Sequence, residues 1–195
     1  MAPTLSDDVD CMENVRKIIH GHIKRMTLSA LFLAIGYVLP FLTGQIQTIG
    51  NMLLPMHIPV LLCGVVCGWQ YGLGVGLILP LTRSLLFGKP ILYPTAVSMA
   101  FELATYGAVI GLVWLLCKRK GLGAIYTSLV SAMLAGRAVW GIAQCTLIGV
   151  GENGFTVTAF ISGGFVKALP GIIIQLIILP PLILLIKHKT NAMEK

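Results

Sequence analysis

Four ionisable side chains stand inside the long apolar stretches of this sequence, and they are the first candidates for chemistry. They are Arg83, Glu102, Arg137 and Lys167. A charge inside a bilayer is costly unless it is paired or hydrated, so such residues mark a functional site by default. Three cations against one carboxylate favour an anionic ligand. In the alternative interpretation, Glu102 pairs with one cation while the others bond to carbonyl groups or reach the interface.

The stretch 44–64 combines polar groups with an apolar run that holds two prolines. Its polar side chains are Gln45, Gln47 and Asn51, and His57 stands between Pro55 and Pro59. Proline kinks a helix, and a kinked segment with a polar start is stable in lipid only where it packs in protein or lines a cavity. We therefore predict that the polar start gates a pocket and that His57 lines it. The alternative is a plain turn before a bent helix, with His57 bonded to a carbonyl group.

Two more side chains are predicted to face the pocket. Gln144 follows Arg137 by seven residues, which places both on one face of a helix. Tyr93 lies in the loop FGKPILYP and can stack on a planar ligand. Aromatic residues are common near membrane interfaces, so Tyr93 alone does not define a site.

The composition places these residues in a membrane. The chain has 195 residues, of which 56% are hydrophobic and only 11% are charged, whereas soluble domains carry about 25% charged residues. At about 20 residues per crossing, the length allows roughly five to seven helices. We predict one all-α integral membrane domain over residues 26–186, with cytoplasmic tails over 1–25 and 187–195.

Six transmembrane helices fit the succession of apolar runs and turn residues. They are predicted over about 26–39, 51–67, 72–86, 95–117, 124–150 and 155–186. Six helices place both termini on one side, and ten basic residues fall on that side against Lys89 alone on the other. Because basic segments stay in the cytoplasm, we predict that both termini are cytoplasmic.

No enzyme motif accompanies these features. The patterns GxSxG, HExxH and GxxxxGK[ST] are all missing, so we predict no catalytic site and no ATP site of the chain's own. The five cysteines are scattered and lack the spacing of a zinc site, and we predict neither a metal nor a cofactor. Energy for uphill transport would come from a partner or from an ion gradient.

A partner site is predicted on the first helix. Ala30 and Ala34 are four residues apart, and small residues at this spacing let another helix approach closely. Such pairs often arise by chance. The place of this pair, at the cytoplasmic start of the first helix, makes it a docking candidate.

Residues 24–189 resemble the substrate-binding S components of energy-coupling factor (ECF) vitamin transporters. The resemblance rests on SALFLAIGYVLP in the first helix, and on LLPMHIPVLLCGVVCGWQYGLGVGLILPLTRSLLFG followed by YPTAVSMAFELATYG. It implies a subunit of the bacterial plasma membrane that captures a vitamin outside and docks through Ala30 and Ala34 onto a transmembrane coupling subunit driven by two ATPases. Within this family the cation surplus favours a carboxylate vitamin, with pantothenate first. Pyridoxine, riboflavin and folate stay open.

A stand-alone secondary carrier, with a proton or ion path through His57, Glu102 and Lys167, is the main alternative. The basic loop at 118–120 divides the helices four to two, which argues against the inverted repeats of many such carriers. An intramembrane enzyme would need a motif that the chain lacks.

Overall fold

The computed structural model describes a chain built from helices. The described residues are 5–42, 55–117, 121–149, 156, 160, 162 and 168–193. In chain order the elements are α1 (Leu5–Leu42), α3 (His57–Val66), α4 (Trp69–Phe87), the short π-helix η1 (Leu92–Ala96), α5 (Val97–Leu116), α6 (Leu122–Ile148) and α8 (Leu169–Met193). No strand occurs among these residues. The predicted all-α class is confirmed, and the six α-helices of the described residues fit the predicted count.

Four segments of the described chain are long and apolar enough to cross a bilayer. They are Ile19–Phe41, Leu92–Leu116, Leu122–Ile148 and Leu169–Ile186. Large hydrophobic side chains such as Leu31, Leu116 and Ile177 are exposed along them, and extended exposed apolar surface is typical of a face that meets lipid or another protein. Together with the low charge content, these segments indicate a multi-pass membrane protein.

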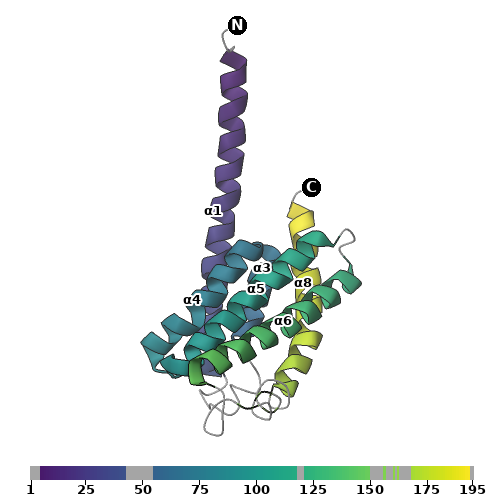
Figure 1. Cartoon of the computed structure of the whole chain (residues 1–195). Helices are drawn as coiled ribbons and strands as arrows, with labels where there is room; N and C mark the ends of the chain where they lie inside the picture. Colours follow the sequence, from purple (N-terminus) through teal and green to yellow (C-terminus); the bar gives the residue numbers. More distant parts are fainter. Residues whose placement is uncertain are drawn as a thin grey trace.

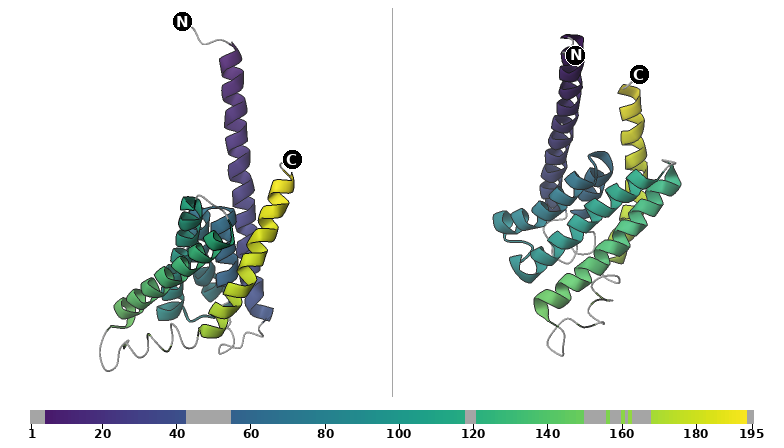
Figure 2. Two further views of the ribbon diagram at one scale, coloured as in Figure 1. Left: turned by 90° about the vertical axis from the view of Figure 1, so that its right-hand side faces the viewer. Right: turned by 45° about the horizontal axis from the view of Figure 1, so that its top comes forward.

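Helix α5 lies at the centre of the helix bundle. It packs against α3, α4 and α6, while α1 packs on α3 and α4, and α8 packs on α3 and α6. Helix α1 extends well beyond the bundle, and both ends of the described chain point to the same side (Figure 1 and Figure 2). The first turns of α5, the end of α6 and the start of α8 therefore lie toward the opposite side, which we call the distal side.

Helix α1 is longer than predicted. It begins at Leu5 instead of residue 26 and continues beyond Pro40 to Leu42. Residues 5–25 contain one glycine and no proline, so nothing in the chain separates the predicted tail from the membrane helix. Pro40 is two residues from the helix end, where its missing N–H group removes one hydrogen bond without ending the helix earlier.

The prolines of the second predicted helix begin that helix instead of kinking it. Pro55 lies in the turn before α3, and Pro59 is the third residue of α3. The first N–H groups of a helix have no partner within the helix, so a proline there loses no hydrogen bond. The predicted kink is therefore wrong over residues 55–66.

Glycines bring the backbones of α3, α4 and α5 into direct contact. A Cβ atom on Gly107 would lie 2.2 Å from the backbone oxygen of Gly72, and one on Gly76 would lie 2.4 Å from that of Leu103. A Cβ atom on Gly64 would meet the oxygen of Gly107 at 2.5 Å. Small residues allow this close approach of helices in membranes. The contacts fix α5 against its neighbours, and α5 carries two of the polar groups described below.

Gly107→Ala is expected to destabilise the fold by about 1–3 kcal/mol, because the added methyl group meets backbone atoms of the next helix. Gly74→Ala is the matched control, since nothing in the described part of the chain lies within 4 Å of its added Cβ atom. Alanine also favours a helix over glycine by about 1 kcal/mol. Thermal unfolding in detergent measures both variants, and equal melting temperatures would contradict this packing.

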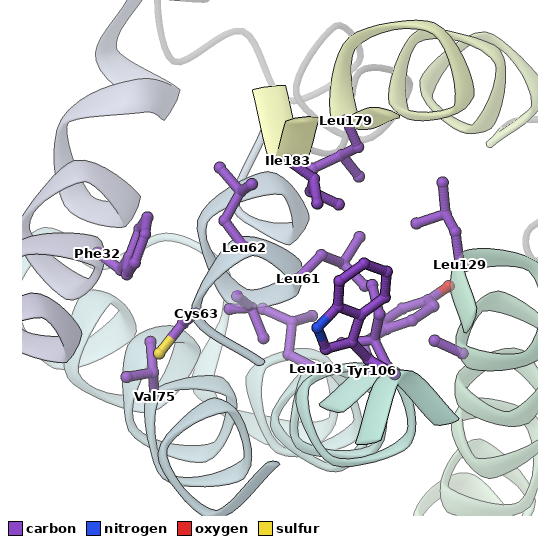
Figure 3. Close-up of a cluster of buried hydrophobic side chains, with 14 of the residues drawn as sticks. Phe32, Leu61, Leu62, Cys63, Val75, Leu103, Tyr106, Leu129, Leu179 and Ile183 are labelled. Atoms are coloured by element: carbon purple, nitrogen blue, oxygen red, sulfur yellow. The ribbon is translucent and has the colours of Figure 1, made fainter. Parts of the chain in front are cut away.

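The apolar core lies between α3, α5, α6 and α8, with α1 and α4 at its edge. Leu61, Tyr106 and Leu179 are almost fully buried. Figure 3 shows these side chains, together with Ile183, gathered around one space between the helices. The positions of the buried polar residues are described below relative to this core.

Candidate functional site

Two pairs of buried polar side chains bridge α5 and α6. The Oε1 atom of Glu102 lies 2.9 Å from Nη1 of Arg137. The Nε2 atom of Gln144 donates a hydrogen bond of 3.0 Å to Oγ of Ser98. Ser98 and Glu102 are one turn apart on α5, and Arg137 and Gln144 are two turns apart on α6. Both residues of α6 thus face α5, as their spacing predicts.

His57 approaches the same carboxylate from α3. Its Nε2 atom lies 3.5 Å from Oε1 of Glu102. Its ring packs edge-to-face on Tyr106, with the ring centroids 5.0 Å apart. His57 and Glu102 are only 1% and 2% exposed, so both are out of reach of bulk water. They are two potential metal ligands, but no group of three or more such ligands occurs among the described residues.

These side chains belong to a polar layer one helical turn from the apolar core. Each of four helices carries a buried polar residue one turn from a buried apolar residue of the core. The pairs, polar residue first, are His57 with Leu61, Glu102 with Tyr106, Arg137 with Met133, and Gln175 with Leu179. In every pair the polar residue is on the distal side, because α6 runs toward that side and the other three helices run away from it (Figure 1). We define the polar layer as His57, Ser98, Glu102, Arg137, Gln144 and Gln175.

Seven buried side-chain atoms have no hydrogen-bond partner within the described part of the chain, and all of them belong to the polar layer. They are Nδ1 and Nε2 of His57, Oε1 of Glu102, Nε and Nη2 of Arg137, Oε1 of Gln144 and Nε2 of Gln175. The contact between Arg137 and Glu102 has the distance of an ion pair but not the geometry of a hydrogen bond. Oε1 of Glu102 can therefore still accept a hydrogen bond. An unmade hydrogen bond costs about 1–3 kcal/mol when the group is buried. Five such side chains on four packed helices, α3, α5, α6 and α8, point to a polar ligand.

The charges of the polar layer cancel among the residues described. Arg137 contributes one positive charge and Glu102 one negative charge, in contact with each other. His57 adds a charge only when it is protonated. The surplus of cations counted along the sequence is therefore not found in this part of the layer, and Lys167 lies outside the described residues.

Arg83 belongs to a different contact, at the seam between α1 and α4. Its Nη1 atom donates a hydrogen bond of 2.9 Å to the backbone oxygen of Tyr37. Its guanidinium lies over the rings of Phe41 and Phe87, 5.4 and 5.5 Å from their centroids. It forms no ion pair with any carboxylate that the structure describes. The contacts of Arg83 tie α1 to α4 through a carbonyl bond and cation–π packing, and its predicted place in the pocket stays a prediction.

Tyr93 also lies apart from the layer. It is on η1, it is 59% exposed, and its hydroxyl donates a hydrogen bond to the backbone oxygen of Leu147. This bond ties η1 to the end of α6. Four other predicted site residues fall outside the described residues, and their roles stay predictions; they are Gln45, Gln47, Asn51 and Lys167.

Two members of the layer were not among the predicted site residues. Ser98 precedes Glu102 by four residues, which is the spacing of one helix face. Gln175 is the single amide side chain in the apolar run 169–186. An isolated amide in such a run is costly to bury without a partner, and that signal could have singled it out.

The predicted docking pair lies on the free face of α1. Ala30 and Ala34 are exposed, whereas Ser29, Phe32 and Gly36 are buried on the side where α1 packs against α3 and α4. The face with the two alanines is therefore covered by no part of the chain that the structure describes.

An all-helical membrane protein that buries a layer of unpaired polar groups has the features of a protein that holds a small polar molecule within the bilayer. Residues 24–183 match the family described as ECF transporter, substrate-specific component. The chain belongs to this family, whose members are substrate-binding subunits of transporters and not enzymes. A comparison with curated proteins and with solved structures gave no match.

Proposed function

We propose that this chain captures a vitamin-sized molecule in its polar layer and delivers it to an ATP-driven ECF importer. One observation carries this proposal. All seven buried polar atoms that lack a hydrogen-bond partner among the described residues lie in the layer. The layer is formed by four helices and rests on an apolar core, which is the usual make-up of a small-molecule site. The family match favours a transporter subunit over a stand-alone carrier.

The ligand enters from outside the cell, on the distal side of the bundle. Both ends of the described chain point away from that side (Figure 1), and ten basic residues belong to the predicted terminal side. Basic segments stay in the cytoplasm, so both termini are cytoplasmic and the layer lies in the outer half of the membrane. We assign the gating of the entrance to Gln45, Gln47 and Asn51, which belong to the segment before His57 in the chain, and a ligand contact to Lys167, which comes shortly before α8.

The chain works with three partner subunits. The exposed face of α1 with Ala30 and Ala34 docks onto a transmembrane coupling subunit, because small residues let a second helix approach closely. Two ATPase subunits bound to that coupling subunit supply the energy, since the chain has no P-loop of its own.

The identity of the vitamin depends on the charge of the site. The preference for a carboxylate vitamin, with pantothenate first, stays a prediction that rested on three cations and one carboxylate. The contact between Arg137 and Glu102 pairs one of these cations, and Arg83 is tied to α1. Uncharged vitamins such as pyridoxine and riboflavin, which the resemblance left open, therefore stand on a par with pantothenate and folate.

Gln175→Met tests whether the layer serves ligand binding. The substitution removes a buried amide that has no partner for its Nε2 atom among the described residues, so the ligand-free variant should be more stable by about 1 kcal/mol. The same substitution should weaken ligand binding about tenfold, which corresponds to one lost hydrogen bond. Melting temperature in detergent and the affinity for the co-purified molecule, identified by mass spectrometry, measure the two effects.

The matched control for this variant is Gln70→Met, which removes an exposed amide at the start of α4. It should change neither melting temperature nor affinity. A Gln175→Met variant that is less stable than the natural chain and binds the ligand equally well would show that this amide serves the fold alone.

A further inference from the structure

We propose that Glu102 sets the charge selectivity of the site: by neutralising Arg137 it makes the polar layer select an uncharged molecule that carries two neighbouring acceptors beside a donor. The inference rests on the proposed function of the polar layer as the substrate site. It concerns which chemical class of substrate that site takes.

One edge of the Arg137 guanidinium, formed by Nε and Nη2, has both of its N–H donors available for a ligand. Its Nη1 atom faces Glu102 at 2.9 Å, whereas Nε and Nη2 have no partner within the described part of the chain. The guanidinium is planar and presents its N–H donors as a rigid fork. A fork of this kind binds the two oxygens of a carboxylate. It also binds a carbonyl oxygen and a neighbouring ring nitrogen, as arginine does on the edge of guanine.

The position of Glu102 decides between these two ligands. A ligand carboxylate on the free edge of Arg137 would place a second anion beside the Glu102 carboxylate, which is only 2% exposed. His57, 3.5 Å from the same oxygen, adds no charge in its neutral form. Among the described residues, two anions then share one cation in a poorly screened site, where like charges repel strongly. An uncharged acceptor pair occupies the same edge and adds no charge.

The other members of the layer require a donor on the ligand as well. The Oε1 atoms of Glu102 and Gln144 are acceptors, and Nε2 of Gln175 is a donor, each without a partner among the described residues. A molecule that satisfies both kinds has N–H or O–H groups next to its acceptors. Amides, lactams and ureido rings supply the donor beside one acceptor, and a second carbonyl oxygen or ring nitrogen next to that group completes the pair of acceptors. The substrate class is therefore an uncharged molecule that carries such a group.

Three matched pairs of probes test this selectivity, because the members of each pair differ mainly in the charge of one group. They are nicotinamide and nicotinate, pantothenol and pantothenate, and biotinamide and biotin. Native mass spectrometry of the full chain in mild detergent, with all six probes at equal concentration, reports which are retained. We expect the natural chain to favour the uncharged member by about tenfold or more. Glu102→Gln should shift that ratio about tenfold or more toward the carboxylate, because the charge of Arg137 is then unbalanced.

Two results would overturn the proposal: retention of the carboxylate member by the natural chain, or an unchanged ratio in Glu102→Gln. The double variant Glu102→Gln/Arg137→Gln removes both charges, so it should keep the preference for uncharged probes and bind them more weakly. A carboxylate preference in the natural chain that disappears in Lys167→Gln would assign the selectivity to Lys167 instead of Glu102. Retention of no probe and of no cellular small molecule by the natural chain contradicts the proposed function itself, which separates the two failures.

Discussion

Replacing Arg137 by methionine is expected to lower the free energy of unfolding by about 3–5 kcal/mol and to abolish ligand binding. Removing one partner of a buried ion pair leaves the other charge without compensation. Among the described residues, the ion-pair partner left to Glu102 would be His57, at 3.5 Å. The substitution also removes the free edge of the guanidinium that we assign to the ligand. Thermal unfolding in detergent and a binding assay measure the two losses.

The double variant Arg137→Met/Glu102→Met separates stability from binding. Replacing a buried ion pair by apolar residues of similar size is often neutral or stabilising. The double variant should therefore regain most of the stability that Arg137→Met loses, yet it should still bind no ligand. The pairing would be contradicted by a single variant as stable as the natural chain, or by a double variant less stable than the single one.

Introducing leucine at both Ala30 and Ala34 is expected to remove most of the substrate uptake while leaving ligand binding by the isolated chain unchanged. Both alanines are exposed on α1, away from the polar layer. Overfilling a close helix contact costs about 1–3 kcal/mol, which weakens docking about 5- to 150-fold. Uptake of labelled ligand by the complete importer in proteoliposomes, and binding by the purified chain, measure the two quantities.

Ala138→Leu is the matched control for the docking variant, since it adds the same side chain at an exposed position of α6. It should leave uptake unchanged. A docking variant that loses binding and uptake together would show that these substitutions damage the fold. Equal loss of uptake in Ala138→Leu would show that α1 has no special role in docking.

The contacts between α5 and α6 show which parts of the site the spacing of residues along the sequence can predict. Seven residues between Arg137 and Gln144 predict a shared helix face, and both side chains do face α5. Glu102 and three cations inside apolar runs allowed the alternative that the carboxylate pairs with one of them, and it does pair with Arg137. Which cation it finds depends on the packing of separate helices, and no local pattern contains that information.

Arg83 and the prolines of the second helix show which features such reasoning does not reveal. A count of charges treats Arg83 as equal to Arg137, although Arg83 is bonded to the backbone of α1, 46 residues away in the chain. Pro59 has a different effect in the first turn of a helix than in its middle. The sequence alone does not show where that helix begins. For the same reason it does not show that α1 begins as early as Leu5.

Native mass spectrometry of the full chain, purified in mild detergent from growing cells, tests the central claim most directly. The natural chain and the control Gln70→Met are predicted to retain one small molecule per chain. A variant that combines His57→Leu with Gln175→Met is predicted to lose it, since both substitutions remove polar atoms that have no partner among the described residues. Retention of the same molecule at full occupancy by this variant would contradict the assignment of the polar layer as the substrate site.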